Sequence, residues 1–273
     1  CLRTFVGHSG PVLAADFSQS NSLAFTASED CTARLWSVNT GECVWVFEGH
    51  RDAVRAASIS SQSTVVITGS DDRAVRLWSV HDGRCIHEFL GHVGPVVSVA
   101  FAPDGLTAVS ASFDGRAKLW SVDTLEYLRT LEGHAGSVLH STFSKNSPFL
   151  LTMSVDVDKP VIVWGLECDG LKKTLCPGLQ VTSAGFSPDG AFVLTACGDW
   201  TARVWSVECD DCLRVFQHAC HVTHAAFSPD GALVATACAD FTARLWNFET
   251  SDCVGTLDGH TGELLSVHFS PDG

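Results

Sequence analysis

The stretch "GHRDAVRAASISSQSTVVITGSDDRAVRLW", residues 49–78, decides the fold of this chain. It contains three short strand-like runs, at 53–59, 64–69 and 74–78, which are separated by turn residues. A fourth run, "CVWVF" at 43–47, precedes them. None of the four has the 3.6-residue periodicity of a helix, so the stretch predicts four short β-strands.

The same pattern recurs along the whole chain with a period near 42 residues. Successive tryptophans are 42, 42, 44, 41 and 41 residues apart, at Trp36, Trp78, Trp120, Trp164, Trp205 and Trp246. Gly-His pairs recur as well, at 7–8, 49–50, 91–92, 133–134 and 259–260. Four antiparallel strands repeated around an axis describe the blades of a β-propeller, so we expect an all-β propeller.

These columns resemble the WD-repeat family, whose signature is Gly-His near the start of each repeat and Trp-Asp near its end. The resemblance covers the whole chain and implies a WD-repeat β-propeller. One departure is that Asp never follows the tryptophan; the residues found there are Ser37, Ser79, Ser121, Gly165, Ser206 and Asn247.

The ends of the sequence set the expected number of blades. The first five residues, "CLRTF", have the pattern of an outermost strand, and "ELLSVHF" at 263–269 has that of an innermost one. We therefore expect six complete four-stranded blades plus an incomplete seventh, with its outer strand at the N-terminus and its inner strand at the C-terminus. Residues 1–273 then form a single propeller domain, which we interpret as a fragment of a longer WD-repeat protein.

Charge and hydropathy exclude several classes of partner. Seventeen basic residues against 31 acidic ones give a net charge of -14, which repels a phosphate backbone. We therefore expect no nucleic-acid partner and no membrane partner, since no apolar run reaches the roughly 18 to 20 residues of a membrane span. Basic protein segments remain compatible with the charge, and the oligomeric state is left open.

The twelve cysteines follow the repeat. One column holds Cys1, Cys43, Cys85, Cys212 and Cys253, and another holds Cys197 and Cys238. Equivalent positions in successive repeats are too far apart to bridge, so most are interpreted as small buried side chains in a reducing compartment. This favours an intracellular, cytoplasmic location.

A hydroxyl, His, Asp and Trp set recurs in nearly every repeat. The resemblance implies a structural hydrogen-bond network in which Asp accepts from His, His meets the hydroxyl, and the hydroxyl meets the indole N–H. A Ser-His-Asp hydrolase is the alternative, but an active site is built once. The network residues are His8, Thr26, Asp30 and Trp36; His50, Thr68, Asp72 and Trp78; His92, Ser110, Asp114 and Trp120; His134, Thr152, Asp156 and Trp164; Thr195, Asp199 and Trp205; His218, Thr236, Asp240 and Trp246.

One segment has metal-ligand spacing. Cys209, Cys212, His218 and His221 resemble a zinc knuckle. Because Cys212 and His218 already fill repeat positions, we predict no metal site. No phosphate-binding loop or dinucleotide fingerprint is present in the sequence, so no cofactor is expected.

Departures from the repeat point to a partner-binding site. The fourth repeat inserts two residues in "DVDKP", 156–160, and the fifth has "CPGLQ", 176–180, in place of Gly-His. Trp200 and Phe241 follow turn aspartates, and Gln217 replaces the glycine before His218. The resemblance places these loops on one face of blades four to six, where Trp200 and Phe241 are candidate anchors beside Asp156, Asp158 and Lys159. Asp199 lacks a histidine partner, and Asp156 and Asp158 compete for the role beside Thr152. A second candidate site in the second repeat contains Arg51, Asp52 and Arg55.

The sequence therefore predicts a non-catalytic scaffold or adaptor that presents protein- or peptide-binding surfaces. Substrate receptors of ubiquitin ligases, cytoskeletal or ciliary assembly factors and signalling adaptors are the classes that the resemblance implies. The alternative is a sensory or regulatory segment of a larger multidomain enzyme, an NTPase or a kinase.

Overall fold

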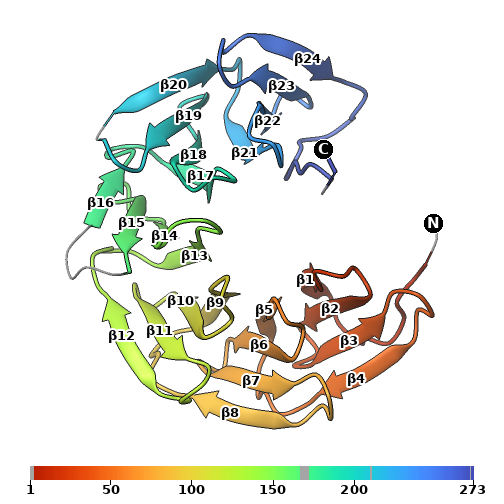
Figure 1. The fold of residues 1–273 in the computed structure, drawn as a ribbon. Helices are drawn as coiled ribbons and strands as arrows, with labels where there is room; N and C mark the ends of the chain where they lie inside the picture. The colour runs from red at the N-terminus through yellow and green to blue at the C-terminus, as the bar shows by residue number, and fades with distance from the viewer. Residues whose placement is uncertain (1–2, 167–171, 210, 271) are drawn as a thin grey trace. The chain divides into compact units, whose positions relative to one another are not determined.

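The computed structural model describes residues 3–166, 172–209, 211–270 and 272–273. In this part of the chain the regular elements are 24 β-strands, which form six four-stranded antiparallel sheets (Figure 1). Each sheet takes four consecutive strands in chain order and corresponds to one sequence repeat. The predicted all-β fold with four strands per repeat is confirmed. We found no helix in the described residues that is long and apolar enough to cross a membrane.

The chain divides into two compact units, Cys1–Phe143 and Ser144–Gly273. Unit 1 contains three whole sheets and the first strand of the fourth. Its strands are β1 (Val12–Phe17), β2 (Leu23–Ser28), β3 (Ala33–Ser37), β4 (Cys43–Phe47), β5 (Val54–Ile59), β6 (Val65–Ser70), β7 (Val75–Ser79), β8 (Cys85–Phe89), β9 (Val96–Phe101), β10 (Thr107–Ser112), β11 (Ala117–Ser121), β12 (Tyr127–Leu131) and β13 (Val138–Phe143).

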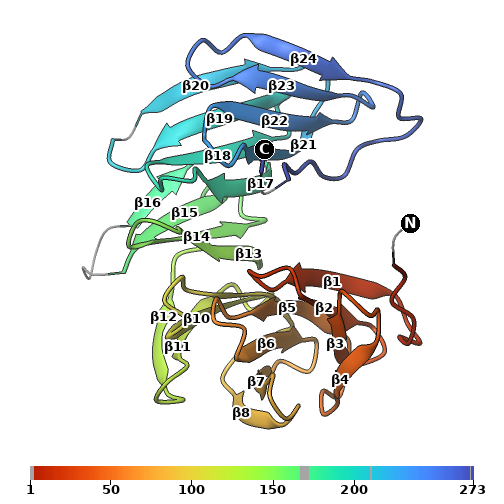
Figure 2. The same ribbon diagram turned by 45° about the vertical axis from the view of Figure 1, so that its right-hand side comes forward.

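Unit 2 contains the other strands of the fourth sheet and two whole sheets. They are β14 (Phe149–Ser154), β15 (Val161–Gly165), β16 (Lys172–Leu175), β17 (Val181–Phe186), β18 (Phe192–Cys197), β19 (Thr201–Ser206), β20 (Cys212–Gln217), β21 (Val222–Phe227), β22 (Leu233–Cys238), β23 (Ala243–Asn247) and β24 (Cys253–Leu257). Figure 2 shows the same strands from a second direction.

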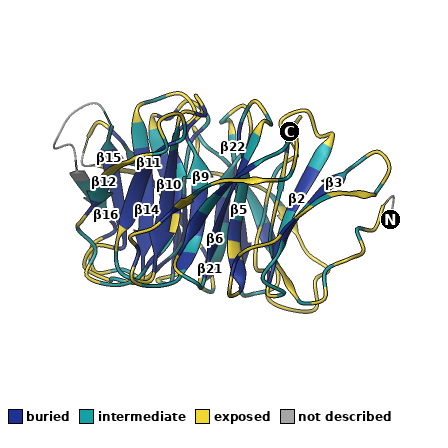
Figure 3. Ribbon diagram, turned by 90° about the horizontal axis from the view of Figure 1, so that it is seen from below, coloured by how far each residue is buried: buried dark blue, intermediate teal, exposed yellow. Residues whose placement is uncertain are grey.

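The second strand of each sheet is buried on both faces, because neighbouring sheets pack against it within each unit. In β6 every residue after Val65 is buried, although side chains alternate between the two faces of a strand. One cluster joins Phe25 and Phe47 of the first sheet to Val54, Val66 and Trp78 of the second. Figure 3 shows buried residues along the strands and exposed residues in the connecting loops. The core therefore lies between successive sheets.

The recurring Pro-Asp-Gly motif forms the turn between the first and second strands of a sheet. Gly105, Gly190 and Gly231 have φ of 73°, 74° and 73°, a left-handed conformation that glycine adopts without steric cost. Gly105 N donates to Ala102 O at 2.9 Å. The glycine therefore allows the tight turn that joins the first and second strands of the sheet.

The two end segments do not form regular strands. Within the described residues, 3–8 and 263–269 contain no assigned strand, whereas the sequence predicts one in each. Phe5 nevertheless packs 5.5 Å from the Trp36 ring, and Thr223 Oγ1 donates to Leu264 O at 2.5 Å. A strand needs a neighbouring strand to complete its ladder of hydrogen bonds. The partial seventh repeat is therefore present as extended segments packed on sheets of their own units.

The prediction that most cysteines are buried is wrong for one column. Cys43, Cys85, Cys212 and Cys253 are exposed because they lie on the outermost strand of each sheet, which has no further strand beside it. Cys43 Sγ donates to the carbonyl of Trp45 at 3.3 Å, and the equivalent thiols do the same on their own strands. Cys197 and Cys238 are buried, and Cys1 lies outside the described residues.

Candidate functional site

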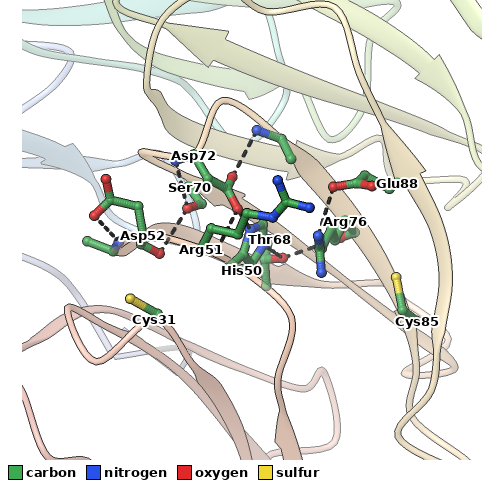
Figure 4. Close-up of polar contacts among 12 residues, drawn as sticks. Cys31, His50, Arg51, Asp52, Thr68, Ser70, Asp72, Arg76, Cys85 and Glu88 are labelled. Atoms are coloured by element: carbon green, nitrogen blue, oxygen red, sulfur yellow. Dashed lines mark hydrogen bonds and ion pairs between the residues drawn. The ribbon is translucent and has the colours of Figure 1, made fainter.

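The second repeat contains a continuous chain of four polar side chains. His50 Nδ1 lies 2.8 Å from Asp72 Oδ2, and His50 Nε2 lies 2.7 Å from Thr68 Oγ1. Trp78 Nε1 donates to the same hydroxyl at 2.8 Å. The loop before β5 supplies His50, β6 supplies Thr68, and the β6–β7 turn supplies Asp72 (Figure 4). The strand β7 supplies Trp78. Four segments of one repeat are thereby joined.

Asp72 is the hydrogen-bond acceptor at one end of this chain of side chains. Burial disfavours the charged form of Asp72, but hydrogen bonds from His50, Arg51 N–H and Ala74 N–H outweigh it and hold the pKa of Asp72 well below its usual range. Asp72 is therefore an acceptor, so Nδ1 of His50 carries a proton, and Nε2 of the same ring contacts the Thr68 hydroxyl. Since Thr68 is fully buried and engaged on both sides, its hydroxyl is placed to brace the sheet and not to attack a substrate.

The first and third repeats have the same geometry. His8 lies 2.8 Å from both Asp30 and Thr26, and Trp36 Nε1 donates to Thr26 at 2.8 Å. In the third repeat the three distances among His92, Asp114, Ser110 and Trp120 are also 2.8 Å. In the fourth, Trp164 Nε1 donates to Thr152 at 2.8 Å; His134 belongs to unit 1 and Asp156 to unit 2.

The sixth repeat differs from the predicted network. Trp246 Nε1 donates to Thr236 at 2.9 Å, but His218 Nδ1 accepts from Arg244 at 2.7 Å and does not meet Asp240. Arg244 also donates to Asp240 at 2.7 Å. His218 Nε2 has no hydrogen-bond partner among the described residues, and the ring stands edge-on to Trp246 with centroids 5.2 Å apart. The predicted direct link between His218 and Asp240 is therefore wrong, because an arginine lies between them.

The glycine before the histidine explains this rearrangement. A Cβ built on Gly49 would collide with the Arg76 guanidinium, so glycine leaves room for that arginine, which pairs with Glu88 at 2.8 Å. The sixth repeat has Gln217 in the glycine position. With a side chain in that space, Arg244 turns to the aspartate instead.

The fifth repeat makes the same substitution with a cysteine. Cys176 takes the glycine position, and Arg203 pairs with Asp199 at 2.5 Å. The buried Cys176 thiol lies 3.3 Å from Thr195 Oγ1, which also accepts from Trp205 Nε1 at 3.0 Å. A thiol thus contacts the hydroxyl that histidine contacts elsewhere.

Four apolar side chains are exposed on the corresponding loops of unit 2, and we call them the aromatic rim. Trp200 is 53% exposed, and the other members are Phe241 (44%), Val155 (57%) and Val157 (51%). Backbone hydrogen bonds connect the loops in series: Gly178 N to Val157 O (2.7 Å), Gly198 N to Gln180 O (2.8 Å), His218 N to Trp200 O (2.9 Å) and Ala239 N to His221 O (3.2 Å). Residues far apart in sequence therefore belong to one surface.

Both aromatic residues have a strained backbone. Trp200 has φ of 73° and Phe241 has φ of 69°, a region that bulky residues rarely enter. Gly115 occupies the same turn position in the third repeat with φ of 82°. A large aromatic side chain at a position suited to glycine, with its ring half in solvent, is typical of a functional residue.

The charged candidates around the rim have different environments. Asp158 and Lys159 are both exposed, and Asp158 N donates to Asp156 Oδ1 at 3.0 Å. The carboxylates of Asp199 and Asp240 are neutralised by arginines of their own sheets. From 144 to 273 the sequence has 16 acidic and seven basic residues, so the rim lies in an acidic unit.

The second candidate site separates into a paired and an unpaired arginine. Arg55 is 2.7 Å from Asp71 at Nη2 and 2.9 Å at Nε, so its guanidinium is engaged. Among the described residues Arg51 bonds through its backbone N–H alone, which donates to Asp72 at 2.9 Å, and its side chain is exposed. Asp52 receives the N–H of Ala53 at 2.8 Å.

A family profile described as "WD domain, G-beta repeat" matches seven successive segments of the chain: 1–37, 41–79, 83–121, 125–164, 171–206, 210–247 and 251–273. The chain belongs to the WD-repeat family. The recurring Gly-His and Trp columns and the four-stranded sheets are those of WD repeats, and the predicted resemblance is confirmed.

Curated relatives match over a stretch about as long as one repeat. "Eukaryotic translation initiation factor 3 subunit I" of Neosartorya fischeri is 49% identical over 43 residues, which is 16% of this chain and 13% of the relative. The Aspergillus fumigatus protein of that name gives the same values, and that of Meyerozyma guilliermondii is 46% identical over 44 residues. The matched stretch therefore spans about one-eighth of these relatives.

Two further points concern the site residues of this WD-repeat chain. In the described part of the chain no three His, Cys, Asp or Glu side chains are arranged to hold a metal ion, and this includes Cys209, Cys212, His218 and His221. The sequence analysis missed Val155 and Val157, which belong to the rim. The sequence did contain an indication of them. Valines flank the turn aspartate of the fourth repeat, whereas the second repeat has the polar residue Asp71 before its turn aspartate.

Proposed function

We propose that this WD-repeat chain is a non-catalytic scaffold that binds other proteins through the aromatic rim of unit 2. The strained and half-exposed Trp200 carries the proposal, because a large aromatic side chain at a positive φ with its ring half in solvent is typical of a functional residue. Phe241 is the second anchor. Asp156, Asp158 and Lys159 border it, and Arg51 and Arg55 mark a lesser contact in unit 1. Buried aromatic anchors supply most of the binding energy in protein interfaces.

The partner that fits the rim is a peptide segment with basic residues between apolar ones. The exposed Asp158 carboxylate and the acidic surroundings attract cations, and an indole face binds a lysine or arginine head. Arg203 and Arg244 pair with the aspartates that directly precede Trp200 and Phe241, so their charges are neutralised and do not repel such a segment.

The cellular setting is part of the proposal. An intracellular, cytoplasmic location is supported by exposed thiols such as Cys43, which donate to carbonyl groups of their own strands as free cysteines do. The likeness to translation initiation factor 3 subunit I extends over a stretch about as long as one repeat, so it supports the repeat type and leaves the partner to be identified by binding.

Replacing either aromatic anchor by glycine separates binding from stability. We expect Trp200→Gly and Phe241→Gly to keep or raise the unfolding free energy, by up to about 1 kcal/mol, because glycine accepts a positive φ. Binding of a fluorescent peptide that alternates lysine and leucine should weaken by about tenfold or more in each variant. Fluorescence polarisation measures the binding, and urea titration measures the stability.

Cys31→Gly is the matched control, since Cys31 has φ of 66° at the equivalent turn position of the first repeat. It should relieve the same strain and leave peptide binding unchanged. Equal binding by the parent, Trp200→Gly and Phe241→Gly would remove the rim as a binding site.

A further inference from the structure

Three arginines of unit 1 are exposed without a strong carboxylate partner. The side chains of Arg51 and Arg73 make no ion pair or hydrogen bond within the described residues, and Arg116 keeps only a 3.5 Å pair with exposed Glu132. Solvent-exposed pairs of this kind contribute little. In a chain with a net charge of -14, unpaired cations in neighbouring loops are unexpected.

The aspartates of the turns in the second and third sheets are already engaged. Asp71 is held by Arg55 at 2.7 Å, and Asp72 accepts from His50 at 2.8 Å and from Arg51 N–H at 2.9 Å. In the third sheet Asp114 accepts from His92 at 2.8 Å. The turn aspartates are therefore occupied within their own sheets, and the three guanidinium groups remain available to an outside anion.

Exposed apolar side chains lie in the loop between β8 and β9 and in the β10–β11 turn, which also carries Arg116. Val93 is 70% exposed, Leu90 is 69% exposed and Phe113 is 49% exposed. Val93 N donates to Asp114 Oδ2 at 3.0 Å, and Phe113 N donates to Pro95 O at 2.9 Å, so both lie at one end of the third sheet. The sequence places polar Arg51 and Asp71 in the equivalent positions of the second repeat.

The second and third sheets meet closely at this end. A Cβ built on Gly69, at the end of β6, would lie 2.6 Å from Val96 Cγ1 at the start of β9. The turn that carries Arg73 follows β6 directly, and the loop that carries Val93 precedes β9 directly. The turn that carries Arg73 and the loop that carries Val93 are thus adjacent, and we call Arg51, Arg73, Arg116, Leu90, Val93 and Phe113 the arginine patch.

We propose that the arginine patch binds an acidic segment of a partner protein in which Asp or Glu residues alternate with large apolar ones. A guanidinium group binds a carboxylate through two parallel hydrogen bonds, which suits three exposed arginines that have no strong carboxylate partner within the described residues. The apolar side chains of the segment cover Val93 and Phe113. The partner has the opposite charge to the one proposed for the aromatic rim, so the two surfaces select different segments.

A short fluorescent peptide that alternates glutamate and leucine tests this proposal with the whole chain. We expect saturable binding that weakens by about tenfold or more in the triple variant Arg51→Gln/Arg73→Gln/Arg116→Gln and in Phe113→Ser. Raising the salt from about 0.05 M to about 0.3 M should weaken binding by the parent. Arg84→Gln and Leu106→Ser change exposed residues elsewhere in unit 1 and should bind like the parent.

The outcomes separate this surface from the aromatic rim. Trp200→Gly should bind the glutamate peptide normally, and the triple arginine variant should bind the lysine peptide normally. Absence of binding to the glutamate peptide, equal binding to its glutamine counterpart, or an equal loss in Arg84→Gln would overturn the proposal. Binding that required phosphoserine in place of glutamate would overturn the choice of a carboxylate ligand. Urea titration of each variant shows whether lost binding reflects unfolding.

Discussion

Trp78→Ala is expected to lower the unfolding free energy by about 3–5 kcal/mol. The indole is 2% exposed and lies 5.4 Å from the Phe47 ring of the preceding sheet, so its removal leaves a cavity between two sheets. The substitution also removes the N–H that Thr68 accepts at 2.8 Å. Urea denaturation followed by circular dichroism measures the change.

Trp200→Ala is the control for this experiment, because Trp200 is a half-exposed tryptophan outside the core. Its unfolding free energy should fall by less than about 1 kcal/mol. Trp78→Phe should lower the unfolding free energy by an intermediate amount, because phenylalanine keeps most of the packing but cannot donate the hydrogen bond to Thr68. Similar denaturation midpoints for Trp78→Ala and Trp200→Ala would show that the tryptophan column does not stabilise the sheets.

Acidification from pH 6.5 to pH 4 is expected to destabilise the protein by about 3 kcal/mol through His218 alone. Burial lowers the pKa of His218 to about 4, and the neighbouring Arg244 lowers it further than Asp240 raises it. The unfolded chain takes up a proton near pH 6.5, whereas the folded protein does so only near pH 4. Stability is therefore complete above pH 6.5 and falls as the pH drops through this window. Burial lowers the pKa of His92 as well, which adds a loss of the same sign.

His218→Gln isolates this contribution, because glutamine can still accept from Arg244 and does not titrate. Its unfolding free energy should change less between pH 6.5 and pH 4 than that of the parent, whereas exposed His81→Gln should follow the parent curve. Parallel curves for His218→Gln and the parent would contradict the assignment. The carboxylates act at lower pH: hydrogen bonds hold the pKa of Asp72 low despite its burial, so its stabilisation is lost only below about pH 4.

The sequence by itself determined the repeat, the four strands in each period and the family. Those features depend on local patterns, since the alternation of apolar residues and the turn residues lie within about 40 residues of one another. The polar columns were readable for the same reason: His50, Thr68, Asp72 and Trp78 recur at fixed spacing, and the structure joins equivalent residues in the first three repeats by hydrogen bonds of 2.7–2.8 Å.

Only the tertiary structure decided what depends on neighbouring sheets and on free space. Exposure of Cys43 follows from its place on an outermost strand, which has no strand beyond it. The Arg244 side chain points toward Asp240 because the Gln217 side chain fills the space that glycine leaves open in other repeats. The sequence alone does not show that these two side chains would collide. The structure likewise showed that Arg55 forms an ion pair with Asp71. The guanidinium groups of Arg51 and Arg73 form no ion pair within the described residues, so they can bind an anion of a partner. Such outcomes depend on contacts between residues that the period places far apart, so they appear only when the sheets are packed.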